Sequence, residues 1–265
     1  DAVLPTLGDR SQPEVIADVP APRARILANF GVGYNHIDVE AAKAAGIAVS
    51  NTPGAVTDAT ADIALSLILM TARRLGEGER MLRAGKWEGW GPVQMLGTHV
   101  TGRRLGVIGF GRIGKAIAKR CHYGFDMEVV FYNRSKVEDP GLPARQVGMA
   151  EAMAADFVVV AVPGGKATHH LINAETLGMM QKNGIFVNIS RGDVVDETAL
   201  IAALHEGRIA GAGLDVYEFE PKVPAAFMAM ENVTLLPHLG TACLEVRENM
   251  GMMAVANLIA WADGK

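Results

Sequence analysis

Residues 103–120 read RRLGVIGFGRIGKAIAKR, and this stretch decides the fold. The apolar run at 105–108 is typical of a strand, and the residues after the glycines have the apolar spacing of a helix. Between them, Gly109, Gly111 and Gly114 stand in G-x-G-x-x-G spacing. Strand, glycine turn and helix in that order predict a dinucleotide site. The glycines permit a tight turn, close approach of a pyrophosphate, and close packing of helix on strand.

Length and composition narrow the class of protein. The chain has 265 residues, 49% hydrophobic and 20% charged, which is typical of a globular protein of one large or two ordinary domains. A net charge of −4 favours neither a nucleic acid nor a membrane partner. Two cysteines, Cys121 and Cys243, indicate a reducing compartment. We therefore expect a cytoplasmic protein with both cysteines buried.

The first hundred residues alternate strands and helices, which favours a parallel sheet. We expect strands at 2–4, 25–30 and 47–50, with helices at 11–19 and 39–45. Three strands are fewer than a doubly wound domain usually has. The sequence therefore predicts that the N-terminal part of this first domain is missing.

The second half repeats the alternation with apolar strands that suit burial on both faces. The predicted strands are 127–132, 157–162, 185–189, 209–214 and 233–236, with helices at 173–180 and 196–206. Two longer helices, 58–74 and 241–261, are apolar over most of their surface. We expect both to be buried between domains or between subunits.

The cofactor is predicted from the residues that follow the second strand of this fold. An NAD site has an acidic residue about 20 positions beyond the glycines, where this chain has Asn133, followed by Arg134 and Ser135. A carboxylate would repel a 2′-phosphate, whereas an arginine beside a hydroxyl would bind it. We therefore predict NADP(H), with NAD(H) possible. The alternative is an ordinary solvated basic turn with NAD bound above it.

Three polar residues stand at or near the carboxyl ends of predicted strands, where ligands bind in open α/β sheets. They are Arg191, Glu220 and His238. Each has a structural alternative, namely a surface arginine, a turn acid before a proline, and a loop histidine.

The chain resembles the D-isomer-specific 2-hydroxyacid dehydrogenases over essentially its whole length. The matching segments are NFGVGYNHID (29–38), GRRLGVIGFGRIGKAIA (102–118), NISRGDVVDETAL (188–200), GAGLDVYEFEP (211–221) and LPHLG (236–240). Residues 57–74 and 87–97 are most similar to the glyoxylate/hydroxypyruvate reductases of that family. The resemblance implies NADPH-dependent reduction of glyoxylate to glycolate and of hydroxypyruvate to D-glycerate.

The resemblance also implies roles for residues. Arg191 would bind the substrate carboxylate, assisted by the backbone N–H groups of Val32 and Gly33. His238 would donate a proton to the keto oxygen, and Glu220 would favour the charged form of that histidine. The implied cofactor-binding residues are Thr60, Gly109, Gly111, Arg112, Ile113, Gly114, Asn133, Arg134, Ser135, Val162, Pro163, Thr168, Ile189, Ser190, Asp215, His238 and Gly240.

The implied architecture is a Rossmann-type doubly wound cofactor domain with a flavodoxin-like substrate domain, usually in a homodimer. The domains would be 1–98 for substrate and 99–238 for the dinucleotide, with 239–265 returning to the substrate domain. Two other functions stay open: a dehydrogenase for another D-2-hydroxyacid, and a non-catalytic nucleotide-sensing interaction module on this fold. The remaining histidines show no metal-ligand spacing, so we expect no metal.

Overall fold

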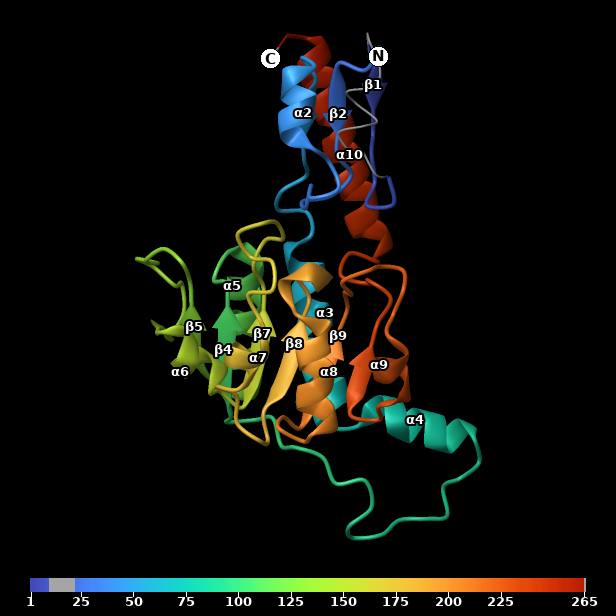
Figure 1. The fold of residues 1–265 in the computed structure, drawn as a ribbon, viewed down its shortest axis with the longest axis vertical. Helices are drawn as coiled ribbons and strands as arrows, with labels where there is room; N and C mark the ends of the chain where they lie inside the picture. The colour runs from blue at the N-terminus through green and yellow to red at the C-terminus, as the bar shows by residue number, and fades with distance from the viewer. Residues whose placement is uncertain (10–21, 265) are drawn as a thin grey trace. The chain divides into compact units, whose positions relative to one another are not determined.

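The computed structural model describes residues 1–9 and 22–264 (Figure 1). The chain forms two compact units, residues 1–59 with 241–265, and residues 60–240. Residues 60–98 thus belong to the second unit, whereas the sequence analysis placed a domain boundary at 98. The assignment of the two units to substrate and cofactor stays a prediction.

The first unit contains a three-stranded parallel sheet in the order β1-β2-β3. Its elements are β1 (Ala2–Val3), β2 (Ile26–Ala28), α2 (Val39–Ala44), β3 (Ala48–Ser50) and α10 (Leu244–Ala262). The three strands confirm those predicted from the sequence, while the predicted helix at 11–19 lies outside the described residues. The Asp38 carboxylate accepts a hydrogen bond from the Ala41 N–H at 2.8 Å and caps α2.

The helix α10 packs against β2 with only part of its surface. Met250 and Ala254 are buried, whereas Met252 and Ile259 are more than half exposed. In the single chain one side of α10 is therefore exposed, and its burial between subunits stays a prediction. Its methionine-rich composition lacks the polar stripe that marks a surface helix, and this is why the sequence favoured burial.

The second unit is built on a seven-stranded parallel sheet in the order β10-β9-β8-β7-β4-β5-β6, which confirms the doubly wound fold. Its strands are β4 (Arg104–Ile108), β5 (Glu128–Tyr132), β6 (Ala144–Gln146), β7 (Phe157–Val160), β8 (Ile185–Asn188), β9 (Gly211–Leu214) and β10 (Val233–Leu235). The chain runs from β4 outward to β6 and then returns to β7 on the other side of β4. The strand order therefore reverses between β4 and β7, where such folds bind their ligands.

Helices cover both faces of this sheet, because successive side chains of a strand point to opposite faces. Val158 and Phe186 pack with α6 (Met149–Met153), α7 (Ala174–Leu177) and α8 (Glu197–His205). On the other face, the neighbouring residues Val159 and Val187 pack with α3 (Thr57–Ala72) and α5 (Arg112–Phe125). In Figure 1, α8 lies in front of the sheet and α3 behind it.

Three further elements complete the second unit. They are α4 (Leu75–Arg83), the 3-10 turn η1 (Gly192–Val194) and α9 (Ala225–Ala229). The short elements β6, α6 and α9 are absent from the sequence prediction, because three to five residues carry no readable periodicity. Among the described residues, no helix combines the length and the apolar character needed to cross a bilayer.

The two cysteines differ in their surroundings. Cys121 is buried on α5, and burial raises the pKa of its thiol to about 12. Cys243 is exposed immediately before α10, so the prediction that both are buried is wrong for this residue.

Two glycines of α5 give a matched test of the packing. A Cβ at Gly114 would lie 2.2 Å from the carbonyl oxygen of Gly109, whereas a Cβ at Gly124 would meet nothing within 4 Å. We expect Gly114→Ala to lower the free energy of unfolding by about 1–3 kcal/mol through overpacking. Gly124→Ala should raise it by about 0.4–1 kcal/mol, because alanine restricts the unfolded chain. Urea denaturation measures both, and equal effects of the two substitutions would contradict the predicted packing.

Candidate active site

The glycine turn joins β4 to α5. Gly109 has φ +95°, and a Cβ there would lie 2.7 Å from the carbonyl oxygen of Ala161. Gly111 is the N-cap of α5 and has no side-chain cap, and a Cβ added to it would meet nothing within 4 Å. Open space therefore lies before the free N–H groups of a 14-residue helix, and this fits a pyrophosphate. Arg112 and Ile113 form the first turn beside it.

The loop after β7 lies opposite the glycine turn, at the place where the strand order reverses between β4 and β7. A Cβ on Gly109 would lie 2.7 Å from Cγ1 of Val162, so the two turns are in close contact. Beyond it, Thr168 donates from its hydroxyl to the carbonyl oxygen of Pro163 at 2.7 Å, and its N–H donates to the carbonyl oxygen of Gly165 at 3.0 Å. These bonds close the loop on itself and leave Val162 and Pro163 beside the glycine turn.

Asn133 connects the glycine turn to the predicted specificity turn. Its Oδ1 accepts a hydrogen bond from the Phe110 N–H at 3.1 Å. Its Nδ2 donates to the carbonyl oxygen of Ser135 at 3.0 Å and to the Ser135 hydroxyl at 3.2 Å. The side chains of Arg134 and Ser135 are exposed. Asn133 therefore has a positioning role here that the sequence analysis did not foresee, since it had considered only the missing acid.

Asn188 shapes the turn that carries Arg191. This residue ends β8 and is 1% exposed. Its Oδ1 accepts from the Ser190 N–H at 3.0 Å and from the Ser190 hydroxyl at 3.1 Å, and its Nδ2 donates to the carbonyl oxygen of Arg191 at 3.0 Å. Sequence reasoning missed Asn188, although a lone asparagine ending a buried strand was a readable signal. Ile189 and Ser190, both predicted to bind the cofactor, are buried in this turn.

The position after Arg191 must be glycine. A Cβ at Gly192 would lie 1.8 Å from the carbonyl carbon of Tyr217, so the two backbones are in direct contact. The loop after β8 is thereby pressed against the loop after β9, which carries Glu220. Burial lowers the pKa of Arg191, and the charges of Glu220 and Asp193 oppose that shift. An arginine nevertheless keeps its charge at neutral pH.

His238 and Glu220 form a pair. Nδ1 of His238 lies 2.8 Å from Oε2 of Glu220, and both side chains are partly buried. Burial alone would raise the pKa of Glu220. The hydrogen bond and charge of His238, the Tyr217 N–H and the charge of Arg191 together lower it below its ordinary value. The fold therefore brings the three predicted catalytic residues of this unit into one electrostatic cluster.

Asp215 fixes the turn that carries His238. Its two carboxylate oxygens accept from the Leu239 N–H at 2.6 Å and the Gly240 N–H at 2.9 Å, and its backbone oxygen accepts from the His238 N–H at 2.9 Å. Burial raises the pKa of Asp215, and these hydrogen bonds oppose the shift. Thr60 donates from its hydroxyl to the carbonyl oxygen of Gly240 at 3.1 Å. Predicted cofactor residues thus hold one another in place.

The two predicted substrate-binding residues of the first unit lie in the loop after β2. Asn29 donates to the carbonyl oxygen of Gly33 at 3.0 Å, and Asn51 donates to that of Val32 at 2.9 Å. Within the part of the chain that the structure describes, the N–H groups of Val32 and Gly33 donate to no acceptor. They fit the predicted role as donors to a carboxylate.

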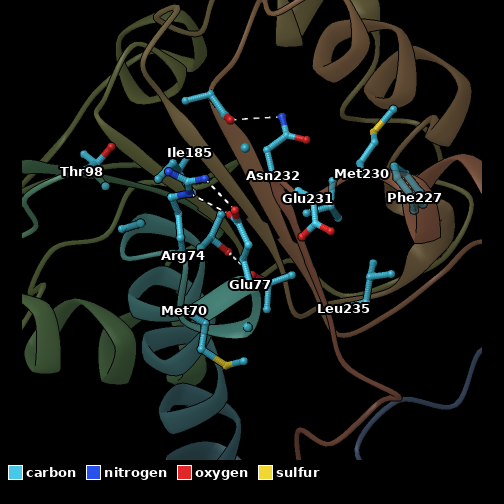
Figure 2. A pocket seen from close by; sticks show the side chains of 18 of the residues that line it. Met70, Arg74, Glu77, Thr98, Ile185, Phe227, Met230, Glu231, Asn232 and Leu235 are labelled. Carbon is cyan, nitrogen blue, oxygen red and sulfur yellow. Dashed lines mark hydrogen bonds and ion pairs between the residues drawn. The ribbon is translucent and has the colours of Figure 1, made fainter. Parts of the chain in front are cut away.

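A separate cavity of about 620 Å³ lies at the amino ends of β8, β9 and β10 (Figure 2). The glycine turn and the His238–Glu220 pair lie at the carboxyl ends, which is the opposite edge of the parallel sheet. Arg74 binds Glu77 through two hydrogen bonds of 2.7 and 2.8 Å, and Arg80 pairs with Glu231. Both arginines of this cavity are thus neutralised by its own carboxylates, and none of the predicted site residues line it.

The fold and the turn between β4 and α5 define a dinucleotide-binding α/β protein. Residues 65–240 match the family described as D-isomer specific 2-hydroxyacid dehydrogenase, NAD binding domain. The chain belongs to this family and is a nicotinamide-dependent oxidoreductase.

Relatives and solved structures support the same family. The chain is 46% identical to a glyoxylate reductase of Pyrococcus horikoshii over 272 residues, which cover all of this chain and 80% of that protein. It is also 46% identical to a glyoxylate reductase of Thermococcus kodakarensis, covering 100% and 81%. The structure is similar to an NADPH-dependent glyoxylate/hydroxypyruvate reductase of Sinorhizobium meliloti in complex with NADP and malonate. The TM-score is 0.83 at 43% identity, covering 89% of this chain and 74% of that one.

The lowered pKa of Glu220 predicts a dependence of stability on pH. A carboxyl group with a lowered pKa stabilises the fold above its unfolded pKa, about 4.3 for glutamate, and the contribution is lost as the pH falls through the folded value. We expect wild type to be more stable than Glu220→Gln at pH 7, and the difference to shrink below about pH 4.3. Urea denaturation at several pH values measures it.

Glu138→Gln is the matched control, because among the described residues this exposed carboxylate pairs with exposed Lys136 alone. Its effect should stay within about 0.5 kcal/mol at every pH. A wild-type advantage over Glu220→Gln that stays constant from pH 7 to pH 3.5 would contradict the assigned cause.

Proposed function

We propose that this chain is an NADPH-dependent reductase of small 2-keto acids, converting glyoxylate to glycolate and hydroxypyruvate to D-glycerate. The observation that carries the proposal is the His238–Glu220 pair, 2.8 Å apart, beside the partly buried Arg191. A positive guanidinium and a proton donor backed by a carboxylate are the groups that reduction of a keto acid requires. The names of the relatives support the same reaction.

Arg191 binds the substrate carboxylate in this mechanism. Its backbone is held by Asn188 and by the contact between Gly192 and Tyr217, so the position from which the Arg191 side chain extends is fixed. As the family resemblance implied, we propose the N–H groups of Val32 and Gly33, which have no acceptor among the described residues, as further donors to a substrate carboxylate. Partial burial strengthens these charge-assisted hydrogen bonds because fewer water molecules compete for them.

His238 supplies the proton. Nδ1 faces Glu220, so the proton given to the keto oxygen comes from Nε2. The Glu220 carboxylate orients the ring and stabilises the imidazolium, and Asp215 holds the backbone of the same turn. A dinucleotide held by the residues named below would supply the hydride that adds to the carbonyl carbon. Product release leaves His238 neutral, and uptake of a proton from water restores it.

The residues proposed to hold the dinucleotide are those of the glycine turn together with Arg112, Ile113, Val162, Pro163, Thr168, Ile189, Ser190, Asp215 and Gly240. Arg134 and Ser135 are proposed to bind the 2′-phosphate. Two observations support that choice: both side chains are exposed, and Asn133 fixes their turn against the glycine turn. The S. meliloti reductase was solved with NADP. We further propose a homodimer in the cytoplasm, as the family resemblance implied.

Steady-state reduction of glyoxylate and of hydroxypyruvate, each with NADPH and NADH, tests the function. We expect turnover with both acids, faster with NADPH. His238→Gln should lower kcat by about 10²- to 10⁴-fold, because the proton donor is lost. Turnover of other 2-keto acids alone would favour a dehydrogenase for another D-2-hydroxyacid. Cofactor binding without turnover of any 2-keto acid would favour the nucleotide-sensing module.

Arg134→Ser tests the cofactor preference. Loss of a charge-assisted contact to a 2′-phosphate should lower kcat/KM for NADPH by roughly 10- to 100-fold and leave that for NADH nearly unchanged. The matched control is Lys136→Gln, because Lys136 lies in the same turn and already pairs with Glu138 at 3.0 Å. An equal loss with NADPH and NADH in the Arg134 variant would overturn the assignment of this residue to the phosphate.

A further inference from the structure

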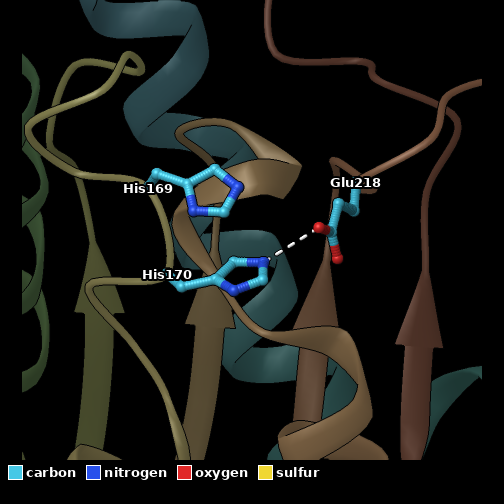
Figure 3. Close-up of side chains that lie close together, drawn as sticks. All are labelled: His169, His170 and Glu218. Atoms are coloured by element: carbon cyan, nitrogen blue, oxygen red, sulfur yellow. Dashed lines mark hydrogen bonds and ion pairs between the residues drawn. The ribbon is translucent and has the colours of Figure 1, made fainter.

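Two consecutive histidines and a glutamate meet at the carboxyl edge of the large sheet (Figure 3). His169 and His170 lie in the loop between β7 and α7, and Glu218 follows β9. Nitrogen and oxygen ligand atoms of all three lie within 4.8 Å of one another. Nε2 of His170 is 2.9 Å from Oε1 of Glu218, and the two imidazole rings stack with centroids 4.0 Å apart.

The backbone holds the two rings on the same side. His170 has φ +49°, a left-handed conformation that non-glycine residues seldom adopt. Its N–H donates to the carbonyl oxygen of Asp193 at 2.9 Å, and its carbonyl oxygen accepts from Nδ2 of Asn173 at 3.2 Å. Successive side chains of an extended segment point to opposite faces. The left-handed turn instead places the exposed His169 ring over the partly buried His170 ring.

The alternative to a metal site is a simple ion pair between His170 and Glu218, which would explain why these two side chains meet but not why His169 lies beside them. His169 takes no part in that hydrogen bond, yet its ring stacks on its neighbour's. The surroundings also favour a cation. The Glu218 N–H donates to the Glu197 carboxylate at 3.0 Å. The carboxylates of Glu197 and Glu218 therefore belong to one hydrogen-bonded region, and negative charge gathers there.

Although the sequence analysis expected no metal, we propose that His169, His170 and Glu218 form a binding site for a divalent transition metal ion of the zinc class. Two imidazoles and one carboxylate are the ligands that such ions accept, with water completing a tetrahedron, whereas Mg²⁺ and Ca²⁺ prefer oxygen ligands alone. Tetrahedral ligands about 2.1 Å from zinc are separated by about 3.4 Å. The present 2.9 Å between His170 and Glu218 needs to open by about half an ångström, and the stacked His169 ring must turn so that the lone pair in its plane faces the ion.

The ion would join two loops that border the proposed active site. Strand β8 lies between β7 and β9, so a metal held by residues following the outer two strands bridges the end of the middle one. The His170 N–H is already bonded to Asp193, in the loop that also carries Arg191. Binding would therefore fasten the loops after β7, β8 and β9 together and stabilise the fold by mass action.

Isothermal titration calorimetry of the untagged full-length chain with ZnCl₂, repeated with MgCl₂, tests the site. We expect one Zn²⁺ per chain and no Mg²⁺, and Zn²⁺ at a hundred times its Kd should raise Tm by roughly 5 °C or more. X-ray absorption at the zinc edge should report N and O ligands at about 2.0–2.2 Å, histidine included.

Three variants make the test specific. His169→Gln and Glu218→Gln should each weaken Zn²⁺ binding by more than the roughly 10- to 100-fold that loss of an outer-sphere partner costs. His169 is exposed, so its replacement leaves the fold intact even if the Glu218 variant unfolds. The matched control is His205→Gln at the exposed end of α8, which should bind like wild type. Absence of stoichiometric binding to wild type, or unchanged binding by His169→Gln, would overturn the proposal.

Discussion

Close backbone contact at the carboxyl edge of the large sheet is the constraint on which the active-site region depends. Gly109 brings the turn after β4 against Ala161, Gly114 seats α5 on that turn, and Gly192 lays the loop after β8 on Tyr217. At each position an added Cβ would lie 2.7 Å or less from a backbone atom. The neighbouring atoms are backbone and cannot rotate away, so these contacts hold the loops in one arrangement.

Polar side chains then fix the orientation of these loops. Asn188 hydrogen-bonds the backbone of the turn that carries Arg191, and Asp215 does the same for the turn of His238. Asn133 joins the glycine turn to Ser135. Each is an amide or carboxylate whose partners are mostly backbone groups, so the side chain replaces bonds that the loop cannot make with itself. None of the three needs to touch substrate to matter. Asn188 and Asp215 fix the turns of Arg191 and His238, which are proposed to act on the substrate, and Asn133 fixes the proposed 2′-phosphate turn.

Charges at this edge oppose the cost of burial. Arg191 is partly buried and its lost hydration lowers the pKa of its guanidinium, while the charges of Glu220 and Asp193 oppose that shift. Glu220 in turn remains ionised because His238, Tyr217 and Arg191 outweigh its desolvation. A neutral substitution at any one position changes the balance at the others, as expected for coupled groups in a site of low dielectric.

The sequence by itself determined the element order, the glycine turn and the residue types at the strand ends, because these follow from local periodicity and turn chemistry. It also placed Arg191, Glu220 and His238 at one edge, since the carboxyl ends of parallel strands share an edge. Only the tertiary structure decided that Gly192 lies on Tyr217 and that Glu218 meets His170. It also showed that much of α10 is exposed. Contacts between loops that follow different strands depend on strand order and loop path, which no local pattern encodes.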